Sequence, residues 1–216
     1  MGRTKPASRR KNHLSGIRAT KPLEILHADA TLFRMKDNAK AFIYLLQDNF
    51  SRAILSFRTA LECKAKYAFE NIKYVHQYFI AQSGIEHCRL VTDDGSENYG
   101  EAARFLDACE SPEIEHLIAQ KTILQSNSMI EAANKQIKYC FLYHKEISNF
   151  EQLEKYLKLA VEDYNNRPHD VLNGLTPAEV LKGKKPSEVD FKKQIAGAKT
   201  TRLTENKKMK CCSFSF

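Results

Sequence analysis

Three absences narrow the class of protein before any motif is considered. No apolar run approaches the roughly 18 to 20 residues that a membrane-spanning helix needs, and the basic first residues lack the hydrophobic stretch of a signal peptide. We therefore expect no membrane segment and a place in the cytoplasm. The six cysteines are scattered, without C-x-x-C or paired histidines, which favours buried free thiols over a zinc site or a disulfide framework. No Ser-His-Asp grouping, phosphate loop or dinucleotide fingerprint is apparent.

The charge of the chain is unevenly distributed. There are 34 lysines and arginines against 26 aspartates and glutamates, a formal net charge of +8. Residues 1–22 hold seven basic residues and no acidic one, and residues 181–216 hold ten basic and three acidic, which leaves residues 23–180 with a net charge of −6. We expect a basic arm or truncated linker, a core domain and a basic tail over these three ranges. The basic ends suggest a polyanionic partner, most simply nucleic acid.

Hydrophobic periodicity predicts one α/β domain with a mixed sheet. A turn at residues 48–51 joins the second and third predicted strands into an antiparallel hairpin. The last predicted helix opens with a capping box at residues 148–151 and ends before Pro168. The predicted strands span residues 24–33, 41–46, 53–58, 86–92 and 114–119, and the predicted helices span residues 64–82, 97–109, 128–146 and about 149–167.

Three acidic residues lie in positions that call for an explanation. Asp29 lies inside the first strand, Asp93 ends the fourth strand, and Glu131 lies in the third helix. Each has an ordinary alternative: a hydrogen-bonded or edge-strand aspartate, a turn residue and a helix-surface ion pair. Their order along the chain favours a shared role. Converging carboxylates repel one another without a cation, and they suit Mg²⁺ or Mn²⁺, which in pairs about 3.5–4 Å apart activate a nucleophile and stabilise a leaving oxygen at phosphorus.

The third predicted helix separates charge from apolar surface. Glu131, Lys135 and Lys138 fall within an arc of about 60°, so an acid and two bases share one exposed face, and Asn127 lies close to the same arc. The opposite face carries the apolar stripe, made of Ile130, Ala133, Ile137, Cys140 and Phe141.

At these residues the sequence resembles the integrase catalytic core of bacterial insertion-sequence transposases, which are relatives of retroviral integrase and belong to the DDE superfamily. The resemblance extends over about residues 16–186. It is carried by several motifs in the same order, namely His27 to Thr31, Asp48 to Arg52, Thr92 to Glu97, Asn127 to Lys138, Tyr164 to His169 and Gly174 to Glu179.

The resemblance implies a ribonuclease H-like fold, with a mixed five-stranded sheet flanked by helices. It makes Asp29, Asp93 and Glu131 the catalytic carboxylates and the ligands of Mg²⁺ or Mn²⁺, with two ions expected. Asp48 is a rival for the first position, but its surroundings match a family turn. Asp94 is expected beside the site.

The resemblance also implies residues that contact DNA. Lys135 and Lys138 match helix positions that contact DNA ends in relatives, and Asn127 is assigned to the same surface. The remaining expected contacts come from the basic arm, and they are Arg9, Arg10 and Lys11. Among the histidines, we expect His27 to be a hydrogen-bonded strand residue and His169 a loop or packing residue.

The expected activity is metal-dependent DNA nicking and strand transfer at the nucleoid, as in transposition and DNA integration. We expect DNA and further copies of the chain as partners. Because no helix-turn-helix precedes the core, a separate DNA-recognition subunit is also expected, unless the chain is truncated. Two alternatives stay open. One is a degenerate or domesticated core that binds DNA or assembles with other subunits, and the other is a ribonuclease H-like nuclease that cleaves hybrids or junctions.

Overall fold

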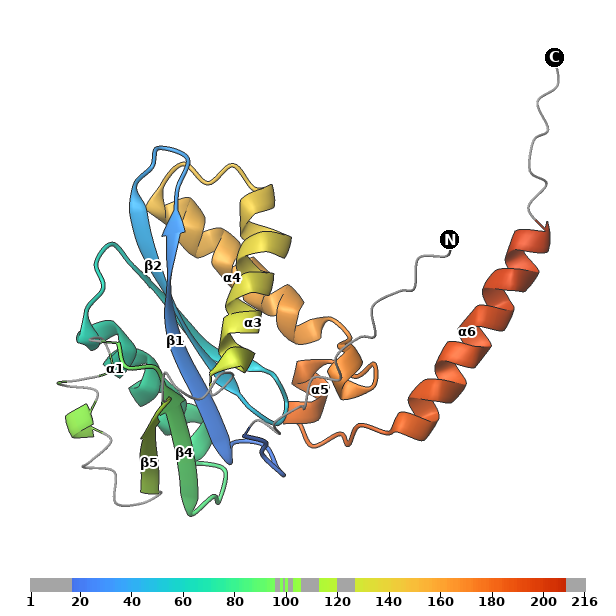
Figure 1. Cartoon of the computed structure of the whole chain (residues 1–216), viewed down its shortest axis with the longest axis horizontal. Helices are drawn as coiled ribbons and strands as arrows, with labels where there is room; N and C mark the ends of the chain where they lie inside the picture. The colour runs from blue at the N-terminus through green and yellow to red at the C-terminus, as the bar shows by residue number, and fades with distance from the viewer. Residues whose placement is uncertain are drawn as a thin grey trace, which may run out of the picture.

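A mixed five-stranded sheet forms the centre of the molecule (Figure 1). The computed structural model describes residues 17–95, 98, 100, 103–105, 113–119 and 127–208. The strand order is β3-β2-β1-β4-β5; the first three strands are antiparallel, while β4 runs parallel to both β1 and β5. The strands are β1 (Ile25–Arg34), β2 (Lys40–Asp48), β3 (Ile54–Ala60), β4 (His87–Thr92) and β5 (Glu113–Ile118). The five predicted strands and the hairpin are therefore confirmed.

Helices cover both faces of this sheet. On one face, apolar side chains of β1, β2 and β3 pack against α3, η4 and α4; on the other, Ile72 and Val75 of α1 and Ile80 of η1 pack against β1, β2, β3, β4 and β5. Burial on both sides explains why the strands carry apolar residues at consecutive positions. The helical elements are α1 (Ala65–Val75), η1 (His76–Ile80), α3 (Ser128–Gln136), η3 (Ile137–Phe141), η4 (Leu142–His144), α4 (Phe150–Asn166), η5 (Asp170–Leu172), α5 (Pro177–Leu181) and α6 (Glu188–Lys208). Of the helix predicted over residues 97–109, residues 103–105 are described as α-helical and Asn98 as 3-10 helical, and most of that range lies outside the described residues.

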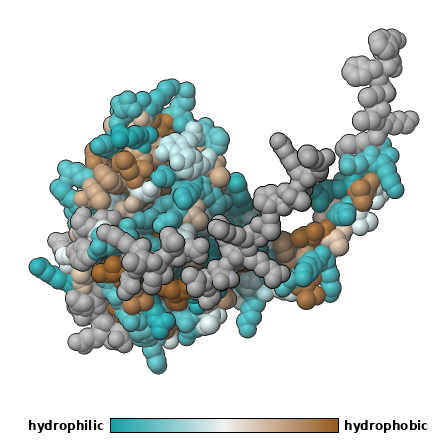
Figure 2. All heavy atoms as spheres, viewed as in Figure 1, coloured by the Kyte–Doolittle hydropathy of each residue, from teal (hydrophilic) through white to brown (hydrophobic). Residues whose placement is uncertain are grey.

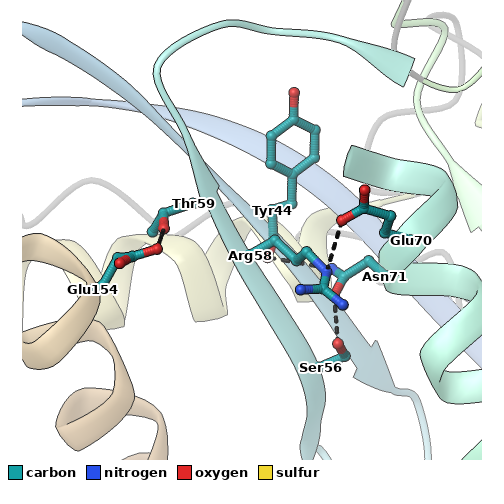
Figure 3. A network of polar contacts seen from close by, with 7 residues as sticks. All are labelled: Tyr44, Ser56, Arg58, Thr59, Glu70, Asn71 and Glu154. Atoms are coloured by element: carbon teal, nitrogen blue, oxygen red, sulfur yellow. Dashed lines mark hydrogen bonds and ion pairs between the residues drawn. The ribbon is translucent and has the colours of Figure 1, made fainter. Parts of the chain in front are cut away.

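The edge strand β3 is tied to both flanking helices by polar contacts (Figure 3). The Ser56 hydroxyl donates to Asn71 Oδ1 of α1, and the Thr59 hydroxyl donates to Glu154 of α4 at 3.0 Å. At the start of β3, the side chain of Asn165 accepts from Ile54 N and donates to Ile54 O, both at 2.9 Å. The last turn of α4 is thereby held against the sheet, which gives part of the segment Tyr164 to His169 a structural role.

The helix that begins with α3 departs from regular α-helical geometry. It passes through a π-helical turn, η3, and ends at His144, two residues earlier than predicted. A π-turn contains one residue more than an α-helical turn, so it rotates the residues beyond it. Leu142 therefore continues the buried stripe after Ile137, while Cys140 is exposed. The predictions that Cys140 belongs to the apolar stripe and that the free thiols are buried were wrong for this residue; Cys63 is also exposed, and Cys88 is buried as predicted.

Two further sequence predictions change at the C-terminal side of the fold. The cap of α4 is Asn149, which accepts from Gln152 N at 2.9 Å, while the Gln152 side chain accepts from Ser148 N at 2.8 Å. The N-cap is therefore Asn149 rather than Ser148, and the predicted reciprocal box between Ser148 and Glu151 is not formed. The basic tail contains a helix, α6, which extends away from the sheet and buries none of its residues (Figure 1).

Helix α6 carries mainly hydrophilic residues with isolated apolar ones between them (Figure 2). Its exposed apolar side chains are Val189, Ile195 and Leu203. Near its start, Phe191 lies against Gly174, where an added Cβ would be 2.8 Å from Phe191 Cε2. Gly174 also has a φ of +79°, so both the close approach and the backbone conformation favour glycine there. Within the described part of the chain, no helix is long and apolar enough to cross a membrane.

Candidate active site

Sheet register brings the first two predicted carboxylates to adjacent strands. In the parallel pair β1–β4, His27 lies opposite Val91. Asp29 follows His27 by two residues and Asp93 follows Val91 by two residues, so the two aspartates come at equivalent positions of neighbouring strands. Asp93 itself lies just beyond the end of β4, where the chain leaves the sheet.

The third carboxylate comes from the first turn of α3. Ile130, Ala133 and Ile137 face the core, and their burial fixes the rotation of the helix about its axis. Glu131 is left exposed, on the side of α3 that carries Lys135. Its backbone N–H donates to Asn127 O at a long 3.4 Å, which is the first hydrogen bond of the helix.

The three carboxylates are close enough to affect one another. Burial, together with the charges of Asp93 and Glu131, raises the pKa of Asp29 to about 6, against a lowering by the hydrogen bond from Asn134. Even so, among the described residues no three His, Cys, Asp or Glu side chains form a group that could hold a metal ion. Asp29 and Asp93 are instead hydrogen-bonded to neighbouring amide groups.

Amide groups hold two of these carboxylates. Asn134 Nδ2 donates to Asp29 Oδ2 at 2.6 Å, and Asn98 Nδ2 donates to Asp93 Oδ1 at 2.8 Å. The Asp93 carboxylate also accepts from Gly95 N at 3.3 Å. Asn134 is almost fully buried, and its other amide atom, Oδ1, has no hydrogen-bond partner in the described structure.

The predicted DNA-contacting residues separate into different environments. Lys135 is exposed, as predicted. Lys138 is half-buried and donates to Thr31 Oγ1 at 2.7 Å, and burial lowers its pKa while the charge of Asp29 raises it. Asn127 is 7% exposed, so the prediction that it lies near the exposed arc was wrong. Arg9, Arg10 and Lys11 lie outside the described residues.

A series of polar contacts joins β1 to the helix formed by α3 and η3. His27, Asp29 and Thr31 alternate along β1 and therefore share one face of the sheet. They contact, in the same order along the helix, Asn127 at 2.8 Å, Asn134 at 2.6 Å and Lys138 at 2.7 Å. Sequence reasoning missed Asn134 and Thr31. The available signals were the spacing of Asn134 three residues after Glu131 and that of Thr31 two residues after Asp29.

Asp48, the rival for the first catalytic position, has a structural role. Its side chain is fully buried at the end of β2. It accepts from Leu23 N at 2.8 Å, from Ser51 N at 2.7 Å and from Ser51 Oγ at 2.5 Å. Burial raises the pKa of Asp48, and the hydrogen bonds from Ser51 and Leu23 lower it. These contacts stabilise the turn between β2 and β3.

His27 behaves as the sequence predicted, as a hydrogen-bonded strand histidine. It is buried, and its two ring nitrogens contact Asn127 and Asn49. Burial lowers its pKa, with a further lowering by the charge of Arg52 and a raising by the hydrogen bond to Asn127. His169 packs edge-on against the ring of Tyr164 at 4.8 Å, in keeping with a packing residue.

Comparison with known proteins agrees with this architecture. Residues 113–177 match the family model described as integrase core domain. None of the curated proteins matches the sequence. Among solved structures, the chain is similar to the catalytic core domain of BIV integrase, with 19% identity, a TM-score of 0.54, and coverage of 74% of this chain and 93% of that one. It is also similar to the HTLV-2 integrase catalytic core domain in complex with magnesium, in its dimeric form, with 15% identity, a TM-score of 0.52, and coverage of 77% and 100%.

A third similar structure is larger than this chain. It is a chain of the simian T-cell lymphotropic virus intasome in complex with PP2A regulatory subunit B56 gamma, with 18% identity and a TM-score of 0.61. The match covers 79% of this chain and 58% of that chain, so the present chain spans little more than half of its length.

The sheet architecture and the similarity to integrase catalytic cores together define the class of fold. A mixed five-stranded sheet flanked by helices, in the arrangement of integrase catalytic cores, is a ribonuclease H-like fold. The family-model match to the integrase core domain includes β5, α3 and α4, and the likeness to integrase catalytic cores extends the same fold over most of the chain.

Proposed function

We propose that this chain is the catalytic core of a DNA strand transferase that nicks DNA at the ends of a mobile element and joins those ends to target DNA. The observation that carries the proposal is geometric: strand register brings Asp29 and Asp93 to equivalent positions of β1 and β4, and α3, which carries Glu131, is hydrogen-bonded to Asp29 through Asn134. In agreement, burial and the charges of Asp93 and Glu131 raise the pKa of Asp29 to about 6. Carboxylates from β1, from the end of β4 and from α3 are thus gathered at one place, where they repel one another in the absence of a cation.

The chemistry of the three carboxylates, rather than their present arrangement, suits a pair of Mg²⁺ or Mn²⁺ ions. Carboxylate oxygen is the donor that these hard cations prefer, and Asp29, Asp93 and Glu131 would hold them. The buried Oδ1 of Asn134, which has no hydrogen-bond partner in the described structure, adds an acceptor beside Asp29 for a hydrated cation. When bound, the cations supply activation of the attacking oxygen and stabilisation of the leaving oxygen at phosphorus.

The protein's own groups position the reactants. In nicking, a water oxygen attacks the phosphorus and the 3′-oxygen of the cleaved strand leaves. In joining, that 3′-hydroxyl loses its proton and attacks a target phosphorus, and the 3′-oxygen of the target strand leaves. Lys135 and Lys138 lie along the same helix as Glu131 and would bind the phosphates of the reacting strand. Asn134 holds Asp29 by its Oδ2 atom, which limits the rotation of that carboxylate.

The proposal extends to the partners of the reaction. DNA is the substrate, and the basic ends, including Arg9, Arg10 and Lys11, would add salt-sensitive affinity. We also propose a homo-oligomer, a DNA-recognition region supplied by another subunit, and an origin in a bacterial insertion sequence that acts at the nucleoid. Asn127 faces β1, so we assign its side chain to positioning rather than to DNA contact.

The test compares two neighbouring carboxylates. Asp93→Asn removes a proposed ligand and should abolish Mg²⁺-dependent nicking of supercoiled DNA and resolution of branched DNA that mimics a joined product. Asp94→Asn makes the same change of charge one residue further on, at an exposed position, and should retain activity. Circular dichroism should show that both variants are folded. Full activity of Asp93→Asn would refute the assignment, and cleavage of RNA–DNA hybrid in preference to DNA would favour the nuclease.

A further inference from the structure

We propose that His27, Asn49 and Asn127 form a clamp that positions Glu131 against Asp29. The three side chains are buried, come from β1, the β2–β3 turn and the start of α3, and form one hydrogen-bonded chain. The inference rests on the proposed function, because it assigns a role to residues that support the proposed metal ligands. None of the three touches the reacting atoms, so they are positioning residues.

The first observation is an N-cap residue that does not cap its own helix. Asparagine at this position commonly accepts a hydrogen bond from a backbone N–H in the first turn. Asn127 makes no such side-chain hydrogen bond. Its Oδ1 atom instead contacts His27 Nδ1 at 2.8 Å, and its Nδ2 atom donates to Ala28 O at 3.4 Å. The side chain thus fastens the beginning of α3 to β1.

The second observation is that backbone groups at the ends of the clamp determine which atom donates and which accepts in each of its hydrogen bonds. Asn49 Oδ1 accepts from Ala19 N at 2.8 Å, and Asn49 Nδ2 donates to Ile17 O at 3.1 Å. The Asn49 amide is therefore oriented with Nδ2 toward His27, whose Nε2 must accept at 2.9 Å. His27 Nδ1 then carries the proton and donates to Asn127 Oδ1. A neutral histidine satisfies the whole chain.

The geometry connects this clamp to the carboxylates. His27 and Asp29 are two residues apart on one strand and share a face, and Asn127 and Glu131 are one helical turn apart. Fixing Asn127 on His27 therefore sets where the first turn of α3 lies relative to β1, and with it the distance from Glu131 to Asp29. The first hydrogen bond of α3, from Glu131 N to Asn127 O, is 3.4 Å, longer than the usual range for backbone hydrogen bonds.

The substitution Asn127→Ser separates the positioning of α3 on β1 from the capping of the helix. Serine is a good N-cap whose short side chain can accept from its own helix but cannot reach His27. The helix start is therefore retained while the link to β1 is lost. The matched control is Asn149→Ser on α4, because Asn149 already caps its own helix by accepting from Gln152 N.

Three quantities are measured for each variant: the melting temperature, the affinity for Mn²⁺ without DNA, and the single-turnover nicking rate at saturating DNA. Asn127→Ser leaves the buried Nδ1–H of His27 without its acceptor, so the variant should melt below wild type while it stays folded at the assay temperature. In that folded protein the Mn²⁺ affinity and the nicking rate should fall by about 10- to 100-fold, the usual effect of losing a partner that orients a metal ligand. Its DNA affinity in Ca²⁺ should be unchanged. Wild-type Mn²⁺ affinity and rate in a folded Asn127→Ser protein would overturn the clamp.

A measurement on the wild-type protein tests the clamp independently of catalysis. Nitrogen-15 NMR of the metal-free protein at neutral pH should show His27 as the neutral tautomer with its proton on Nδ1. A proton on Nε2, or an imidazolium ring, would overturn the proposed direction of the hydrogen bonds. If wild-type protein binds Mn²⁺ but neither nicks nor joins DNA, the proposed function fails, while the clamp is still decided by the tautomer and by the Mn²⁺ affinity of Asn127→Ser.

Discussion

Asp29 has an unfavourable position for a charge. It lies mid-strand, partly buried, with two other carboxylates near it, and the hydrogen bond from Asn134 offsets only part of the cost. A group that destabilises the fold when ionised is expected where function requires it, because a bound cation reverses the balance. The destabilisation caused by ionised Asp29 should therefore be measurable in the unfolding free energy of the metal-free protein.

The first prediction concerns the pH dependence of stability. The folded pKa of Asp29 is about 6 against an ordinary 3.8, so the folded state holds this proton more tightly than the unfolded state. The contribution of Asp29 to unfolding free energy is thus most favourable below about pH 4 and is lost as pH rises to about 6, with a total on the order of 3 kcal/mol. Asp29→Asn should be more stable than wild type above about pH 6 and similar near pH 4.

Urea unfolding in a chelator at several pH values measures this difference. Adding Mg²⁺ near neutral pH should stabilise wild type and leave Asp29→Asn almost unchanged. A stability difference that is constant from about pH 4 to about pH 7 would contradict the raised pKa of Asp29.

Asp48 provides the second prediction, because its role is structural rather than catalytic. Asp48→Ala leaves three buried donors without their acceptor, two on Ser51 and one on Leu23, and should lower the unfolding free energy by about 3 kcal/mol or more. Asp37→Ala is the control, since Asp37 is exposed in the β1–β2 turn and accepts only from Ala39 N among the hydrogen bonds described; it should cost less than about 1 kcal/mol. Asp48→Ala protein that remains folded should still nick DNA, and loss of nicking without loss of stability would favour the rival assignment.

The site residues that could be predicted from the sequence are those whose side-chain type is unusual for the element that contains them. A charged residue within an apolar strand, such as Asp29, is visible without any structure. Asn134 and Asn49 are not, because an asparagine is ordinary in a helix or a turn, and its partner depends on how α3 and β1 are aligned. Asn127 was misplaced for a specific reason: its backbone, with φ −121° and ψ 15°, is not helical, so a helical wheel does not describe its direction.

At the scale of elements, the strands were predictable because each is buried by its own apolar residues. The β2 strand shows this most clearly, with consecutive buried apolar residues from Ile43 to Leu46. Helix α6 was not predictable in the same way, because it buries none of its residues and so has no apolar stripe. The π-turn was also invisible to periodicity, which assumes a constant angle between successive residues. It nevertheless decides which side chains follow Ile137 into the core.

The third prediction tests this π-turn by deletion. Ile137 and Leu142 are both buried and five residues apart, a spacing that the π-turn allows. Deleting the exposed Cys140 makes them four residues apart, which places them on one face of a regular α-helix. The deletion variant should fold with only a small change in melting temperature.

Deletion of Lys155 from α4 is the matched control. Lys155 is equally exposed, but α4 is a regular helix, so the deletion rotates one side of the helix by about 100° relative to the other and takes Leu157 and Ala160 out of the core. That variant should be largely unfolded by circular dichroism. Equal tolerance of both deletions would show that η3 does not have the proposed π-helical geometry.

At the scale of the whole molecule, charge is separated along the sequence. The chain is positive overall at +8, yet residues 23–180 carry a net −6, and this negative part includes Asp29, Asp93 and Glu131. A DNA phosphate that approaches the carboxylates is repelled until cations are bound. The positive charge needed to hold DNA elsewhere is concentrated in the ends, and α6 projects away from the sheet (Figure 1). We therefore expect α6 to contribute affinity without contributing to the stability of the core.

The last prediction separates these two contributions. Residues 187–208 carry six basic and three acidic side chains, and no residue of α6 is buried. A chain that ends at residue 186 should melt close to one that ends at residue 208, but should bind duplex DNA more weakly. For the shorter chain, the slope of the logarithm of the DNA association constant against the logarithm of salt concentration should be smaller in magnitude by up to about 5, if each of the six basic residues neutralises one phosphate. Equal salt slopes would show that α6 does not contact DNA, and a large loss of melting temperature would show that Phe191 against Gly174 supports the core.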